Sequence, residues 1–141
     1  RAMIKEILPH LYRVELPLPG NPLKIINSYI IKGQGRSLII DTGMNREECM
    51  RAMSSGLREL SVDLKVADFF ITHLNADHSG LVSSLVTETS TIYFNQLEAD
   101  SVNHGGNWER SDFAVRNGFP EDEEKKLSRV IRGVNIAPKH I

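Results

Sequence analysis

The sequence predicts an α/β (α+β) fold in which helices pack on one face of a mixed sheet. Two observations carry this prediction. The first half of the chain holds several short segments rich in β-branched residues, whereas residues 45–60 place apolar side chains at helical spacing. The resulting order, β-β-β-α-β-α-β-α-α, favours helices layered on a sheet. The 141 residues, 40% hydrophobic and 25% charged, have the composition of one globular domain.

Three strands are predicted before the first helix. Leu11–Leu16 alternates between polar and apolar residues, which is typical of a half-buried strand. Ile25–Ile31 and Ser37–Ile40 are rich in β-branched residues. The tripeptide Gly33-Gln34-Gly35 separates them, so we expect these two strands to form a hairpin.

The first helix is predicted from Asn45 to about Leu60. Asn45 and Glu48 have the spacing of a capping box. Apolar residues then recur at helical spacing: Cys49, Met53, Leu57 and Leu60. Cys49 lies on this apolar stripe, so we interpret it as a core residue and not as a nucleophile.

The remaining elements alternate and then become helical. The predicted segments are a buried strand at Val66–Thr72, a short helix at Leu81–Val86, a strand at Thr91–Phe94, and helices at 96–104, 107–117 and 120–133. The last helix has acidic residues in its first turn and basic residues later, which complements the helix dipole. We interpret that charged run as a solvated helix surface.

Composition excludes several classes of protein. The formal net charge is −1, and no basic stripe indicates binding to nucleic acid. No apolar run reaches the roughly 20 residues that span a bilayer, and no signal-peptide pattern is present. The single cysteine favours a reducing compartment. We therefore expect a cytoplasmic protein with no membrane partner, a single domain over residues 3–141, and Arg1 and Ala2 as remnants of cloning.

The segment FFITHLNADHSG, residues 69–80, contains the strongest candidates for metal-binding or catalytic residues. If the strand continues extended, His73, Asn75 and Asp77 point to the same side, because side chains alternate along a strand. His78 would join them from the start of the next helix. Imidazoles and a carboxylate are ligands for zinc, iron or manganese. A second interpretation remains open, in which His73 merely ends a strand and Asp77 caps the next helix.

A family resemblance bears on this choice. The stretch THLNADHSG resembles the H-x-H-x-D-H signature of the metallo-β-lactamase superfamily, with Asn75 in place of the second histidine. LIIDTG, with Asp41, resembles the strand that precedes the first helix in that family, and NSYII resembles the hairpin before it. The resemblance covers roughly residues 7–95. It implies an αββα sandwich, of which this chain supplies mainly the N-terminal half.

The resemblance also implies roles for the cluster. His73, Asp77 and His78 would be metal ligands, and Asp77 would also act in catalysis by orienting the attacking water. Asn75 would be a weak or vestigial ligand, because a neutral amide oxygen suits zinc poorly. Asp41 would support the metal loop through hydrogen bonds without ligating.

The function implied is that of a metal-dependent hydrolase. A metal-bound hydroxide would attack an ester, thioester, lactone, lactam or phosphodiester in a small-molecule substrate. Zinc is the expected metal, with iron or manganese as alternatives. Two other functions remain open: an iron-dependent redox member of the fold, of flavodiiron or sulfur-dioxygenase type, and a catalytically dead binding or assembly module.

The C-terminal part of the chain does not match the remaining ligands of the family. His104 and His140 are interpreted as surface residues, and Trp108 and Phe113 either pack a helix or line a substrate cleft. We therefore expect this chain alone to be inactive, although its parent would be an enzyme. Half of a sandwich would also expose an apolar sheet face. We expect either a second copy of the chain or a missing C-terminal segment to cover it, and the homodimer is the preferred hypothesis.

Overall fold

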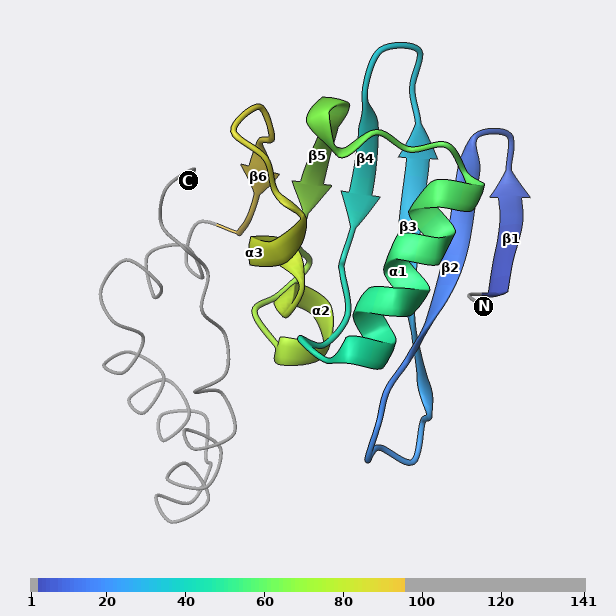
Figure 1. Cartoon of the computed structure of the whole chain (residues 1–141), viewed down its shortest axis with the longest axis vertical. Helices are drawn as coiled ribbons and strands as arrows, with labels where there is room; N and C mark the ends of the chain where they lie inside the picture. The colour runs from blue at the N-terminus through green and yellow to red at the C-terminus, as the bar shows by residue number, and fades with distance from the viewer. Residues whose placement is uncertain (1–2, 96–141) are drawn as a thin grey trace.

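The computed structural model describes residues 3–95 as one sheet with helices on one face (Figure 1). The strands are β1 (Met3–Leu8), β2 (Leu11–Pro17), β3 (Ile25–Lys32), β4 (Ser37–Ile40), β5 (Ala67–Phe70) and β6 (Ile92–Tyr93). The helices are α1 (Glu47–Glu59), the 3₁₀ helix η1 (Leu64–Val66), α2 (Ala76–Ser79) and α3 (Val82–Leu85). The helices predicted beyond residue 95 lie outside the described residues.

The sheet is mixed, as predicted. Its order is β1-β2-β3-β4-β5-β6. The first four strands form an antiparallel meander, whereas β5 and β6 each run parallel to the strand before them. A parallel neighbour requires a crossover, and α1 lies in the crossover between β4 and β5. The α/β prediction is confirmed, and the carboxyl ends of β4, β5 and β6 share one edge of the sheet.

The strands predicted at Leu11–Leu16, Ile25–Ile31 and Ser37–Ile40 agree with β2, β3 and β4 within one residue at each end. No strand was predicted at Met3–Leu8, where β1 forms the edge of the sheet. Five of its six residues are exposed, and MIKEIL lacks the alternation that marks a half-buried strand. Pairing with β2 therefore makes this segment a strand, and its own sequence pattern does not.

Helix α1 begins later than predicted, because Arg46 is its N-cap residue and no side chain caps it. The capping box assigned to Asn45 and Glu48 is therefore wrong. The preceding loop is fixed elsewhere, since the backbone N–H of Leu81 donates to the carbonyl of Gly43 at 3.1 Å. That contact draws the loop toward α2 and α3, so the helix begins only after it.

The end of α1 agrees with the prediction. Ser61 takes φ +54, and the N–H of Val62 donates to the carbonyl of Leu57 at 2.8 Å, which ends the helix. Nζ of Lys32, from β3, donates to the carbonyl of Leu60 at 2.5 Å. A cation here complements the negative end of the helix dipole.

The strand predicted at Val66–Thr72 is shorter in the structure. The carboxylate of Asp63 accepts the N–H of Lys65 at 2.9 Å and so begins η1, which occupies the first predicted strand residue. The ladder ends at Phe70. The residues that follow leave the sheet and enter the loop that carries the histidines.

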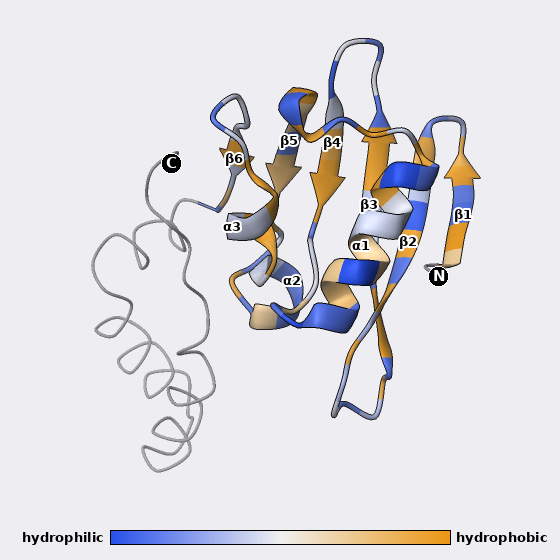
Figure 2. Ribbon diagram, viewed as in Figure 1, coloured by the Kyte–Doolittle hydropathy of each residue, from blue (hydrophilic) through white to orange (hydrophobic). Residues whose placement is uncertain are grey.

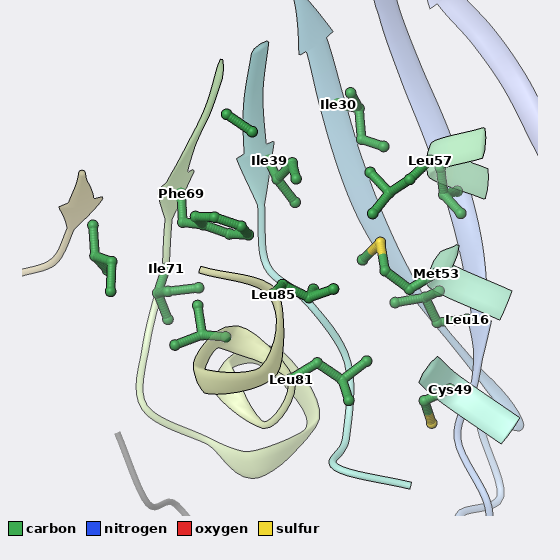
Figure 3. Close-up of a cluster of buried hydrophobic side chains, with 14 of the residues drawn as sticks. Leu16, Ile30, Ile39, Cys49, Met53, Leu57, Phe69, Ile71, Leu81 and Leu85 are labelled. Carbon is green, nitrogen blue, oxygen red and sulfur yellow. The ribbon is translucent and has the colours of Figure 1, made fainter. Parts of the chain in front are cut away.

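The core lies between the sheet and the helices. Its fully buried members include residues of β2 to β5, Ile71 just after β5, and the apolar stripe of α1. Figure 3 shows these side chains facing one another: Leu16, Ile30, Ile39, Phe69, Ile71, Cys49 and Met53. Leu81 and Leu85, from the α2–α3 segment, close the same cluster (Figure 3). Cys49 is therefore a core residue, as predicted, and burial raises the pKa of its thiol.

The opposite face of the sheet is also apolar in part. The register places Tyr29, Ile40, Phe70 and Tyr93 in one row across four strands. Phe70 and Tyr93 are 42% and 51% exposed. Figure 2 shows that hydrophobic residues run through the central strands. The sequence predicted an exposed apolar face of the sheet, and this row lies on such a face.

An ion pair joins Arg36, just before β4, to Asp68 of β5, and both residues also bond to the segment before β6. Nε and Nη2 of Arg36 donate to the carboxylate of Asp68 at 2.8 and 2.7 Å. Nη2 also donates to the carbonyl of Thr89, and the N–H of Thr91 donates to Asp68. The Arg36 guanidinium, followed by the Thr91 N–H, lowers the pKa of the Asp68 carboxyl.

This lowered pKa predicts a pH dependence. The unfolded state binds the Asp68 proton more tightly than the folded state, so stability falls as the pH drops through the carboxyl range, below about pH 4. We expect Asp68→Asn to make the free energy of unfolding less dependent on pH in the acid range. Near neutral pH, the variant and the wild type should differ by a constant amount. Urea unfolding at a series of acidic pH values measures the slope, and an unchanged slope would contradict the assignment.

Candidate metal centre

The candidate site lies where β4 and β5 end at the same edge of the sheet. Because these strands are parallel, the residues that follow them lie side by side. The backbone N–H of Asp41 donates to the carbonyl of Phe70 at 3.0 Å. The N–H of Thr72 donates to Oδ1 of Asp41 at 2.9 Å. The two loops thus leave the sheet already joined.

Asp41 is buried, with 6% of its surface exposed, and takes φ +56. Aspartate is one of the few residues besides glycine that enter this left-handed region readily. The hydroxyl of Ser28, on β3, donates to the Asp41 carbonyl at 2.8 Å. The backbone of Asp41 is held on both sides, so its carboxylate has a fixed direction.

Both carboxylate oxygens of Asp41 are occupied by groups of the chain. Oδ1 accepts the N–H of Thr72, and Oδ2 lies 2.7 Å from the hydroxyl of Thr72 and 2.7 Å from Nδ1 of His78. A carboxylate used in this way orients its neighbours instead of presenting a free oxygen to a metal. This geometry fits the supporting role expected for Asp41.

A second set of bonds joins the loop after β4 to α2 and α3. The N–H and hydroxyl of Thr42 donate to the carbonyl of His78 at 2.6 and 3.0 Å. The packing is tightest at Gly80, where a Cβ would lie 2.4 Å from the carbonyl oxygen of Ala76, 2.6 Å from the nitrogen of Asn45 and 2.8 Å from the carbonyl oxygen of Gly43. Only a residue without a side chain allows this approach.

The extended geometry predicted for residues 73–77 is wrong. Helix α2 begins at Ala76, so Asp77 lies in its first turn and does not continue the strand. The alternative, in which Asp77 caps the next helix, is also wrong, because Leu81 occupies the N-cap position of α3. The N–H groups of His78 and Ser79 both donate to the carbonyl of Asn75, and this closes the turn.

The structure nevertheless places His73 beside His78, and His78 beside Asp77. The two imidazole rings have centroids 3.9 Å apart and planes inclined by 47°. Nε2 of His78 lies 3.6 Å from Oδ2 of Asp77. Nδ1 of His73 lies 2.9 Å from the hydroxyl of Thr72. Asn75 is exposed at the N-cap position of α2, and its side chain does not cap that helix.

His78 and Asp77 have the spacing of two ligands of one divalent metal. Two ligands of a tetrahedral zinc ion lie roughly 3.4 Å apart when each bond is about 2.1 Å long, which is close to the His78–Asp77 separation. However, no group of three His, Cys, Asp or Glu side chains within residues 3–95 is placed to hold an ion. The ligand roles of His73, Asn75, Asp77 and His78 therefore stay predictions. His104, His140, Trp108 and Phe113 lie outside the described residues.

Thr72 is the residue of this site that the sequence did not single out. Its hydroxyl lies between the Asp41 carboxylate and the His73 ring. One feature of the sequence points to it in retrospect, because it directly precedes the first histidine. The other feature is structural, because Thr72 follows a strand that runs parallel to the strand before Asp41. Only the pairing of those two strands makes the position informative.

The fold and the histidine–aspartate cluster at the carboxyl edge of the sheet define the class of protein to which the chain belongs. The sequence model of the metallo-β-lactamase superfamily matches residues 21–129. The chain therefore belongs to the metallo-β-lactamase superfamily, and the family resemblance of its sequence is confirmed. Members of this superfamily bind divalent metals. No helix among residues 3–95 is long and apolar enough to cross a membrane.

Individual relatives agree with this membership. A metallo-β-lactamase family protein from Thermus thermophilus has a TM-score of 0.68 and 21% identity, with 96% of this chain and 46% of that chain covered. A β-lactamase domain protein from Burkholderia ambifaria has a TM-score of 0.64 and 17% identity, covering 98% and 43%. An atrochrysone carboxyl ACP thioesterase from Emericella nidulans is 33% identical over 85 residues, 60% of this chain and 26% of that protein. The chain thus spans about a quarter of that thioesterase and less than half of these two structures.

Proposed function

We propose that this chain is the N-terminal part of a metal-dependent hydrolase that cleaves small acyl compounds, with thioesters and esters as the favoured substrates. Membership of the superfamily and the similarity to a thioesterase support the reaction class. The observation that carries the proposal is the geometry around Asp41. Nδ1 of His78 and Nδ1 of His73 are both turned toward hydrogen-bond partners, which leaves both Nε2 atoms for a metal.

The site would hold its metal through His73, Asp77 and His78. A divalent ion bound there would polarise the scissile carbonyl and activate a water molecule. Asp77 would position that water, because its carboxylate lies beside His78 in the first turn of α2. Asp41 and Thr72 would hold the imidazoles in place, and such supporting groups matter nearly as much as the ligands themselves.

Asn75 would leave one metal position weak. A structural neighbour from Cronobacter sakazakii, with a TM-score of 0.59, is named for a HARLDQ motif. By spacing, the arginine of that motif corresponds to Asn75 in HLNADH. A non-histidine residue at this position is thus compatible with the fold. Zinc stays the expected metal, and iron content with visible absorbance would instead indicate the redox alternative.

Asn75→His is expected to increase the metal content of the purified chain. Histidine would add a neutral imidazole at an exposed position between His73 and Asp77, where Asn75 offers only a weak amide oxygen. Elemental mass spectrometry of both proteins, purified with the same zinc supplement, measures the zinc per chain. Asn21→His, in the loop between β2 and β3, is the control for an added surface histidine.

Equal metal content in the Asn75→His protein and the control would contradict the proposed ligand role of position 75. Negligible metal in every version would favour the second candidate, a non-catalytic binding or assembly module. One observation supports that candidate, namely that residues 3–95 alone do not assemble three metal-binding side chains. The homodimer, the cytoplasmic location and the inactivity of the isolated chain stay predictions, and light scattering tests the first.

A further inference from the structure

We propose that Thr72 is a positioning residue whose hydroxyl, together with the Asp41 carboxylate, fixes the tautomer of His73. Four groups form one continuous chain of short contacts. His78 Nδ1 lies 2.7 Å from Asp41 Oδ2, that oxygen lies 2.7 Å from Thr72 Oγ1, and Thr72 Oγ1 lies 2.9 Å from His73 Nδ1. One carboxylate thus reaches both imidazoles, one directly and the other through a hydroxyl.

Counting the protons of these four groups determines which atom donates in each hydrogen bond. An ionised carboxylate only accepts hydrogen bonds, so both neighbours of Asp41 Oδ2 must donate to it. His78 therefore carries its proton on Nδ1. The Thr72 hydroxyl has a single proton, which it gives to Asp41, so it can only accept from His73. His73 must then carry its proton on Nδ1 as well.

The consequence is that both neutral imidazoles present an unprotonated Nε2. In each ring the nitrogen that is left free is set by the hydrogen bond made by the other nitrogen. The ring centroids are only 3.9 Å apart, so the two rings lie side by side. Their use as metal ligands rests on the proposed function, whereas the tautomers themselves do not.

The hydroxyl of Thr72 is itself held in place. The same residue donates its backbone N–H to Asp41 Oδ1 at 2.9 Å and its hydroxyl to Oδ2. This two-point contact with one carboxylate restricts the χ1 rotation of a β-branched side chain that is already stiff. Thr72 is exposed, so removal of its hydroxyl leaves the apolar core untouched and the protein is expected to fold.

The test is the tautomer of each histidine in metal-free, ¹⁵N-labelled protein. Long-range ¹H–¹⁵N correlation spectra distinguish a protonated from an unprotonated ring nitrogen. Spectra are recorded at about pH 8, above the ordinary histidine pKa of about 6.5. The variants are Thr72→Val, which keeps the shape and removes the hydroxyl, and Thr72→Ser, which keeps the hydroxyl. Thr91→Val, an exposed threonine before β6, is the matched control, and His10 in the β1–β2 turn is an internal reference.

We expect Nδ1–H at both His73 and His78 in the wild type, in Thr72→Ser and in Thr91→Val. In Thr72→Val, His73 should shift to Nε2–H, while His78 keeps Nδ1–H because its bond to Asp41 remains. A wild-type His73 with its proton on Nε2 would overturn the proposal, as would an unchanged His73 in Thr72→Val. Unfolding of Thr72→Val would leave the wild-type and serine spectra to decide.

A zinc titration of the same proteins separates this inference from the proposed function. Thr72→Val should bind Zn²⁺ about 10- to 100-fold more weakly than the wild type, with rescue by Thr72→Ser. If the tautomers behave as expected but even the wild type binds no Zn²⁺, the positioning role of Thr72 holds and the metal-dependent hydrolase does not.

Discussion

Replacing Asp41 by asparagine is expected to move the protons of both histidines to Nε2 and to weaken Zn²⁺ binding by about 10- to 100-fold or more. The amide has one oxygen and one NH₂ group. The site, however, needs a hydrogen-bond acceptor at both Oδ1 and Oδ2 of residue 41. If the oxygen keeps the N–H of Thr72, the NH₂ group must donate to the Thr72 hydroxyl and to His78. Each hydrogen bond between His78, position 41, Thr72 and His73 then has its donor and acceptor exchanged.

The opposite orientation of the amide is less favourable. It would place the NH₂ group against the backbone N–H of Thr72, and two donors facing each other in a buried site cost about 1–3 kcal/mol. Asparagine tolerates the left-handed backbone of position 41 (φ +56), so the variant should still fold.

The measurement on Asp41→Asn combines a zinc titration with the ¹⁵N spectra of His73 and His78. Asp63→Asn is the control, because that residue caps η1 and its remaining oxygen can still accept the N–H of Lys65. Wild-type zinc affinity in Asp41→Asn would contradict the orienting role, and so would unchanged tautomers.

Gly80→Ala is expected to cause the largest loss of stability, about 2–4 kcal/mol. A Cβ at this position would lie 2.4–2.8 Å from three backbone atoms, which belong to Ala76, Asn45 and Gly43. Backbone atoms cannot rotate away as a side chain can, so the loop after β4 must separate from α2 and α3. The bonds from Thr42 to the His78 carbonyl should be lost with it.

Gly35→Ala provides the matched control. A Cβ at Gly35 meets nothing within 4 Å, so this change should be neutral or stabilise the protein by up to about 1 kcal/mol. Urea unfolding of both variants gives the difference directly. Equal stabilities for the two alanine variants would show that the contact between the loops is looser than the structure describes.

The sequence was informative wherever local pattern determines structure. Alternation and β-branched residues located β2, β3 and β4, and the apolar stripe located α1. These signals work because each element buries one face of its own. β1 has almost no buried face, so its sequence, MIKEIL, has no pattern that predicts a strand. The start of α1 was misplaced because contacts with Gly80, far away in sequence, hold the preceding loop.

The candidate site shows the same division between local and long-range effects. Residue type and the family resemblance together singled out His73, Asp77 and His78, because histidine and aspartate are common ligands of a catalytic metal. Their geometry could not be predicted, since helix α2 begins one residue after Asn75 and turns Asp77 away from the strand direction. The role of Thr72 depends on a parallel pairing of two strands that are separated by α1. A pattern within one segment contains no information about that pairing.

On the proposed function, the chain presents two neutral imidazoles, each with Nε2 free, to one divalent metal. The most direct measurement is a Zn²⁺ titration of the ¹⁵N-labelled wild-type chain, followed at the ring nitrogens of its histidines. We predict saturable shifts at Nε2 of His73 and His78, with both Nδ1 atoms still protonated and His10 unchanged. Zinc binding through Nδ1 of either ring, or shifts at His10 with none at His73 and His78, would contradict it.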